Sequence, residues 1–94
     1  MFPVLCLGQY TTIPDQNFEQ ALIDFGYDDV IDGKLLTANI NSVDSLSLER
    51  KNISDLIGVE AFTALKYLDC YNNQLTNLDV SKNTVLTDLN CGRN

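Results

Sequence analysis

The sequence predicts an α/β fold in which short parallel strands stack into a repeat solenoid, with irregular return segments and a helical cap at the N-terminal end. Two observations predict it. A motif of apolar residues and Asn recurs at fixed spacing in the second half of the chain, and one amphipathic segment precedes it. Repeats of roughly 20–50 residues are typical of solenoids, and a solenoid needs a terminal unit that shields its first repeat from water.

The repeat is clearest between residues 65 and 94. The segment Leu65-x-x-Leu68-x-Cys70-x-x-Asn73 recurs 21 residues later as Leu86-x-x-Leu89-x-Cys91-x-x-Asn94. A weaker copy lies 22 residues upstream, where Val43, Leu46 and Leu48 match and Lys51 stands in the place of the Asn. Half a period is also visible, because Leu78-x-Val80-x-x-Asn83 repeats the second part of the motif 10 residues later. Such spacing predicts one structural unit per copy.

Each copy is predicted to contain a short strand followed by a turn. Leu68 and Cys70 alternate with period two, so both side chains point to one face of a strand and Asp69 points to the other. Asn73 follows where its amide can bond backbone groups that a turn leaves unpaired. Stacked copies bury an apolar face that one strand cannot bury alone. The predicted core contains Leu68, Cys70, Leu75, Leu78, Leu86 and Leu89, and the predicted exposed residues are Tyr67, Asp69 and Tyr71.

These motifs resemble a known family. Residues 65–80 match the LxxLxCxxNxLxxLDL repeat of bacterial leucine-rich-repeat proteins, with Val80 in place of the last Leu. Residues 52–65 are similar to the first repeats of internalin-type proteins. The resemblance implies a leucine-rich-repeat solenoid over residues 43–94, in a family of secreted or cell-surface binders that includes adhesins. Because the sequence stops at Asn94 inside a repeat, we expect the repeat region to be truncated there.

Residues 10–42 are predicted to form the N-terminal cap, with a helix over residues 15–25. Asp15 is a suitable N-cap residue. The apolar residues that follow at helical spacing are Phe18, Ala21, Leu22 and Phe25. Gly26 is expected to end the helix.

Residues 28–39 resemble an EF-hand calcium loop that has lost ligands. Asp28 fits the first ligand position, Asp32 fits the fifth, and Gly33 fits the sharp turn. Val30 has no side-chain oxygen at the third position, and Asn39 cannot supply the bidentate carboxylate needed at the twelfth. We therefore expect a turn held by side-chain hydrogen bonds, and no metal site.

Residues 1–9 are predicted to lie outside the folded part of the chain. The run from Phe2 to Leu7 is apolar, and Cys6, Leu7 and Gly8 are followed by Gln9 in a pattern similar to a signal-peptidase site. The segment is therefore interpreted as the remnant of a secretory signal peptide or as a disordered leader.

Charge and residue types exclude several classes of function. The net charge of −7, from 6 basic and 13 acidic residues, argues against nucleic acid and anionic membrane surfaces. No apolar run approaches the roughly 20 residues of a membrane span. The chain has no His, the commonest general base, and no glycine-rich phosphate loop. Cys70 and Cys91 occupy equivalent strand positions and point the same way, which favours buried thiols over a disulfide or a zinc site. We therefore expect no catalytic residue, no cofactor and no enzyme.

The outward face of the strands remains as the candidate site. Its predicted ligand-facing residues are Tyr67, Asp69, Tyr71, Asp88 and Asn90. Aromatic side chains on a rigid strand give a large contact area at low cost in conformational entropy. The expected function is recognition of a protein or glycan by a secreted or cell-surface module. The alternative is a purely structural cap or spacer for a longer repeat array or for an appended domain.

Overall fold

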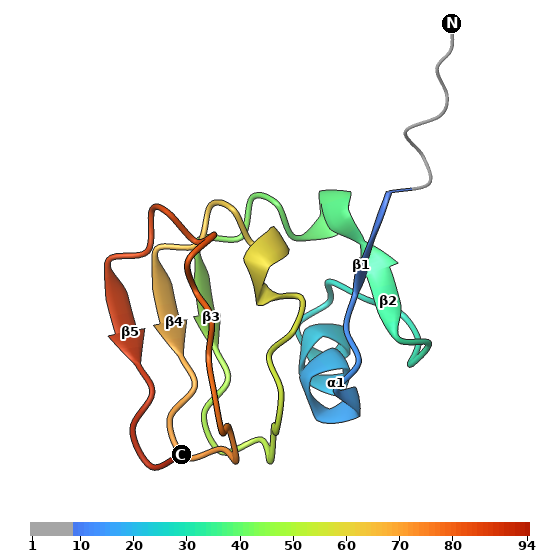
Figure 1. Ribbon diagram of the computed structural model, residues 1–94. Helices are drawn as coiled ribbons and strands as arrows, with labels where there is room; N and C mark the ends of the chain where they lie inside the picture. The colour runs from blue at the N-terminus through green and yellow to red at the C-terminus, as the bar shows by residue number, and fades with distance from the viewer. Residues whose placement is uncertain (1–8) are drawn as a thin grey trace, which may run out of the picture.

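The computed structural model describes residues 9–94 as two small sheets, one α-helix and two 3₁₀ helices (Figure 1). Along the chain these are β1 Tyr10–Thr12, α1 Gln16–Asp24, β2 Lys34–Leu36, η2 Thr37–Asn39, β3 Ser45–Ser47, η3 Val59–Ala61, β4 Tyr67–Asp69 and β5 Asp88–Asn90. The predicted leader, residues 1–9, lies outside the described residues except for Gln9. Within the described chain no helix is long and apolar enough to cross a membrane.

One sheet is antiparallel and the other is parallel. β1 pairs with β2, with Thr11 opposite Leu35. β3, β4 and β5 form the parallel sheet, in which Leu46, Leu68 and Leu89 lie in one row. These leucines are 22 and 21 residues apart, which is the spacing of the sequence repeat. The predicted pairing of successive copies as parallel strands in this register is confirmed.

The predicted leucine-rich-repeat solenoid, however, is wrong. The described residues form a small compact α/β unit with one helix, a two-stranded antiparallel sheet and a three-stranded parallel sheet. In a solenoid each repeat contacts only its neighbours, whereas here buried residues from Ile13 to Leu75 belong to one core cluster. Phe18 of α1 stacks on Phe62, with ring centroids 6.3 Å apart. The repeat spacing predicts which strands pair, but it carries no information about this shared core.

α1 is fixed at its N-terminus by one carboxylate. Asp15 Oδ1 accepts hydrogen bonds from the backbone N–H groups of Asn17 and Phe18, at 2.9 and 3.0 Å, as expected of an N-cap residue. Its other oxygen, Oδ2, accepts from the N–H groups of Ser54 and Asp55, 39 and 40 residues later. Asp15 therefore both starts the helix and joins it to the segment that precedes η3.

Asn side chains hold the turns that follow the strands, as the repeat predicts. Asn73 Oδ1 accepts from the N–H groups of Lys51 and Ile53, and its Nδ2 donates to the carbonyls of Leu48 and Cys70. The Asn thus satisfies backbone groups of its own copy and of the preceding one. The first copy can therefore have Lys51 where the later copies have Asn, because Asn73 of the next copy bonds the backbone N–H of Lys51.

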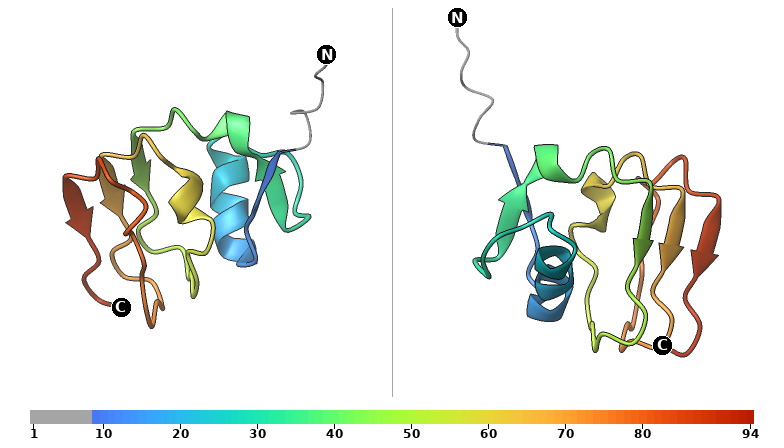
Figure 2. Two further views of the ribbon diagram at one scale, coloured as in Figure 1. Left: turned by 45° about the horizontal axis from the view of Figure 1, so that its top comes forward. Right: turned by 180° about the vertical axis from the view of Figure 1, so that it is seen from behind.

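The predicted core is confirmed only in part. Leu68 and Cys70 are fully buried and Leu75 is buried, whereas Leu78 and Leu86 are only partly buried against the core. Leu89, predicted to be buried, is 42% exposed. The reason is its place on β5, the edge strand farther from α1, whereas Leu46 on the opposite edge strand, β3, is buried on the side of α1 (Figure 2). Phe25, placed on the inward face of the predicted helix, is 41% exposed because the helix ends there and the chain turns at Gly26 with φ of +92°.

Candidate functional site

The predicted ligand-facing residues lie on neighbouring strands of the parallel sheet. Tyr67 of β4 stands opposite Asp88 of β5, and Asp69 stands opposite Asn90. Tyr71 continues the outward row two residues beyond Asp69, and on this segment the outward residues alternate with the buried residues Leu68 and Cys70. Figure 2 shows β3, β4 and β5 side by side, with α1 and the loop after it on the side of β3.

Asp69 organises this face instead of being exposed on it. The prediction that Asp69 is exposed is wrong, because only 7% of its surface is accessible. Its Oδ2 accepts a hydrogen bond from the Tyr67 hydroxyl at 3.3 Å, and its Oδ1 accepts from the N–H of Tyr71 at 3.0 Å. The carboxylate therefore lies between the two tyrosines and links them. Tyr67 is 38% exposed, as predicted, and Tyr71 is partly exposed.

The ring of Tyr71 lies close to the next strand. A Cβ atom added to Gly92 would be 3.2 Å from Tyr71 Cδ1, so a larger residue there would press on the ring. Asn90 Oδ1 accepts from the N–H of Gly92 at 3.3 Å, which holds the backbone below the ring. The tyrosine is thus supported by the backbone of the neighbouring copy.

The face is negatively charged around Tyr67. The pKa of the Tyr67 phenol is raised, first by partial desolvation, then by the charge and hydrogen bond of Asp69, and further by Glu49 and Asp88. A phenol ionises less readily beside carboxylates because two negative charges repel. Three carboxylates from three neighbouring copies of the repeat therefore act on one exposed ring.

Toward α1 the face continues into a hollow of about 200 Å³ lined by Phe25, Tyr27, Ser45, Leu46 and Ser47. The outward residues of β3 are serines, so this side of the face is polar, and the ring of Phe25 forms an exposed apolar border.

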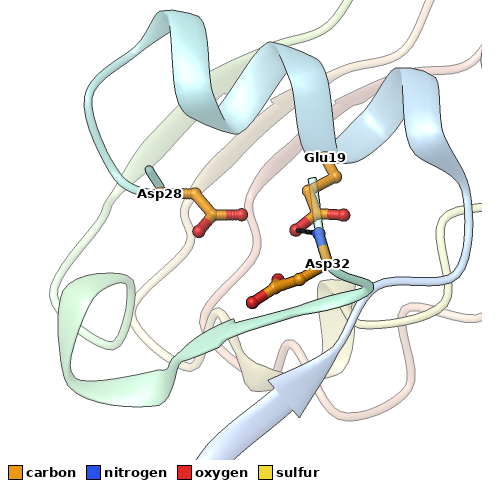
Figure 3. A group of neighbouring side chains, drawn as sticks. All are labelled: Glu19, Asp28 and Asp32. Carbon is orange, nitrogen blue, oxygen red and sulfur yellow. Dashed lines mark hydrogen bonds between the residues drawn. The ribbon is translucent and has the colours of Figure 1, made fainter. Parts of the chain in front are cut away.

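A second group of polar side chains joins α1 to the loop that follows it. Carboxylate oxygens of Glu19, Asp28 and Asp32 lie within 4.8 Å of one another (Figure 3). Glu19 is fully buried, and its two oxygens accept from the N–H groups of Asp32 and Gly33 at 3.2 and 2.9 Å. The loop pattern places Asp28 and Asp32 together, as expected, but the third carboxylate comes from the helix.

Sequence reasoning missed Glu19. Its position offers a signal, because it directly follows Phe18 and precedes Leu22 by three residues, and both of these are buried. An acidic residue on the inward face of a helix needs hydrogen-bond donors, and the neighbouring loop supplies them.

Opposing influences act on the carboxyl group of Glu19. Burial raises the pKa of Glu19, the hydrogen bond and charge of Asp28 raise it further, and the N–H groups of Gly33 and Asp32 oppose the shift. Asp28 Oδ2 is buried without a hydrogen-bond partner in the described chain, while Asp28 Oδ1 accepts from the N–H of Asp29. The N–H groups of Asp32 and Gly33 that bond Glu19 join the loop to α1, so the geometry fits a tether for the loop.

The cysteines differ in environment. Cys70 and Cys91 are both free, but Cys70 is buried and Cys91 is exposed. The predicted pair of buried thiols is therefore correct only for Cys70. Burial, followed by the proximity of Cys91 and Asp69, raises the pKa of Cys70 to about 11. A thiol with this pKa is protonated at neutral pH and is not a nucleophile.

Comparison with known proteins finds no family model that matches the sequence and no curated protein with significant similarity.

Proposed function

We propose that this chain is a secreted or cell-surface binding module that recognises a protein or glycan ligand through the outward face of β3, β4 and β5. The arrangement of Tyr67, Asp69 and Tyr71 is the observation that carries the proposal. Asp69 bonds the hydroxyl of Tyr67, which holds that ring, and the backbone N–H of Tyr71, which holds the main chain at that residue, before a ligand arrives. A preorganised surface loses less conformational entropy on binding than a mobile one.

Catalysis has less support. Cys70 is fully buried and has a raised pKa. Asp69 has both oxygens engaged in positioning the tyrosines. These groups fix a surface and leave no activated nucleophile there.

Binding of the full chain to a panel of purified basic and acidic proteins and neutral and anionic polysaccharides tests the proposal. The variant Tyr67→Ala removes an exposed ring of the face. Tyr10→Ala is a matched control, because Tyr10 lies on β1 and is 50% exposed. We expect at least one panel member to bind wild type and Tyr10→Ala alike and to bind Tyr67→Ala about ten-fold more weakly. Binding that is insensitive to Tyr67→Ala would contradict the proposal.

A structural role is the second candidate, and the exposed strand β5 favours it. Leu89 is 42% exposed beside an unpaired strand edge, a surface that suits packing against further polypeptide. If the chain serves only as a cap or spacer, Leu89→Lys will impair its function in the cell while Tyr67→Ala has no effect. Loss of function with Tyr67→Ala alone would exclude the purely structural role.

A further inference from the structure

We propose that the outward sheet face binds an Arg or Lys side chain carried by a protein ligand. This inference rests on the proposed function and specifies the chemistry of the ligand. Tyr67 lies on the middle strand, directly between Ser45 of β3 and Asp88 of β5. Tyr67 is 38% exposed, and its neighbour on β3 is the small residue Ser45.

Carboxylates surround this ring on its polar side. The hydroxyl of Tyr67 is 3.3 Å from Asp69 Oδ2, and Glu49 and Asp88 are close enough to act on the same group. Asp69 keeps acceptor capacity, since it bonds only uncharged donors and each carboxylate oxygen has more than one acceptor site.

The charge of the face is only partly neutralised within residues 9–94. The one ion pair of this part of the chain joins Arg50 Nη1 to Glu49 Oε1 at 3.9 Å, and both side chains are well exposed. Such a pair contributes little and exchanges readily with solvent. Asp88 has no cationic partner among the described residues. An anionic ligand would be repelled, and a neutral sugar would use the ring but gain nothing from the charge.

A cation placed over an aromatic ring and beside carboxylates is favoured by both contacts. The described residues already contain two contacts of a cation with an aromatic ring, because Lys34 Nζ lies 5.0 Å from the ring centroid of Tyr10 and Lys51 Nζ lies 5.9 Å from that of Phe25. Around Tyr67 the ring and the acids are present, but no cationic side chain of the described chain lies over the ring. Charge complementarity therefore assigns this position to the ligand.

The test uses calorimetry, at low and high ionic strength, to measure how tightly each of two peptides binds the full chain. One is a Gly/Ser peptide that carries three arginines, and the other has citrulline at each arginine. Citrulline keeps the shape of arginine and removes its charge. We expect the arginine peptide to bind about ten-fold more tightly than the citrulline peptide, and to weaken at high salt.

Two charge-removing variants separate local from general electrostatics. Asp88→Asn should weaken binding of the arginine peptide about three- to ten-fold, whereas Asp29→Asn, in the loop after α1, should leave it unchanged. Tyr67→Ala should weaken it by a similar or larger factor. Circular dichroism of each variant checks that the fold is retained.

Three outcomes would overturn the inference. These are equal binding of the two peptides, equal effects of Asp88→Asn and Asp29→Asn, and no binding of the arginine peptide at millimolar concentration. If neutral polysaccharides bind through Tyr67 and the arginine peptide does not, the proposed function stands and the cationic ligand is excluded. If no ligand depends on Tyr67, the proposed function fails as well.

Discussion

At Glu19, burial and hydrogen bonding act in opposite directions on one carboxyl group. The pKa of Glu19 is raised overall by burial and by Asp28, although two backbone N–H groups oppose the shift. A folded-state pKa above the unfolded value means that the folded protein binds the proton more tightly. The stability from this group is therefore fully present below the unfolded pKa and is lost as the pH rises through the folded pKa.

Asp28→Asn tests this account of the carboxyl pair. The Asn amide can donate to Glu19 while its oxygen still accepts from the N–H of Asp29, so the unpartnered oxygen and the like charge both disappear. We expect about 1 kcal/mol of added stability at pH 7 and a smaller loss of stability above the unfolded pKa of Glu19. Urea unfolding between about pH 4 and 8, a range that begins near the unshifted pKa of a Glu side chain and extends above it, measures both. If Asp28→Asn instead lowers the stability at pH 7, the negative charge of Asp28 is needed for the fold.

Calcium should add little at this loop. Val30 supplies no ligand, and the Asn39 amide is engaged because its Nδ2 donates to the Tyr27 carbonyl at 3.2 Å. We therefore expect no specific uptake of calcium at millimolar concentration, measured by calorimetry on the full chain. Micromolar affinity for calcium that is lost in Asp32→Ala would refute this expectation and show that Glu19, Asp28 and Asp32 form a metal site.

At the scale of single elements, the Asn turns are the part of the structure that the repeat predicts best. Asn73→Ala removes two accepted and two donated hydrogen bonds at a buried position. Unpaired buried backbone groups each cost about 1–3 kcal/mol, so we expect a loss of at least about 3 kcal/mol. Asn77→Ala is the control, because Asn77 is exposed. Equal thermal unfolding midpoints for the two variants would contradict the role of Asn73.

The elements show what the sequence can and cannot predict. Period-two alternation and a fixed repeat locate β3, β4 and β5 because strand pairing here follows the chain at constant spacing. The antiparallel pair of β1 and β2 is not predicted, since each strand has only three residues and neither belongs to the repeat that locates the equally short strands of the parallel sheet. The prediction that Tyr67 and Asp88 point outward is correct. The burial of Asp69, in contrast, depends on its hydrogen bonds to Tyr67 and Tyr71, which no periodicity in the sequence describes.

At the scale of the whole molecule, the shared core explains why the solenoid prediction failed. A repeat describes contacts between copies, and Phe18, Ile13 and Leu35 lie outside the repeat yet pack in the same core. Hydrophobic contacts between segments that differ in sequence leave no periodic signal.

The open edge of β5 predicts self-association of the 94-residue chain. Val85 and Leu89 are 44% and 42% exposed, and β5 has unpaired backbone groups along one side. Unpaired apolar edges tend to pair with other chains. Light scattering should show a mass that rises with concentration, and Leu89→Lys should reduce it while Ile57→Lys, at another exposed apolar position, should not. A wild-type chain that is monomeric at all concentrations would show that the edge is protected.

The central claim, that the outward face of the parallel sheet binds the ligand, is tested most directly by nuclear magnetic resonance. The full chain, labelled with ¹⁵N, is titrated with the arginine peptide or with the tightest member of the binding panel. The account predicts that amide shifts concentrate at residues 67–71 and 88–92. Shifts confined to the loop after α1 or to the return segment at residues 74–85, with the amides of β4 and β5 unchanged, would contradict it.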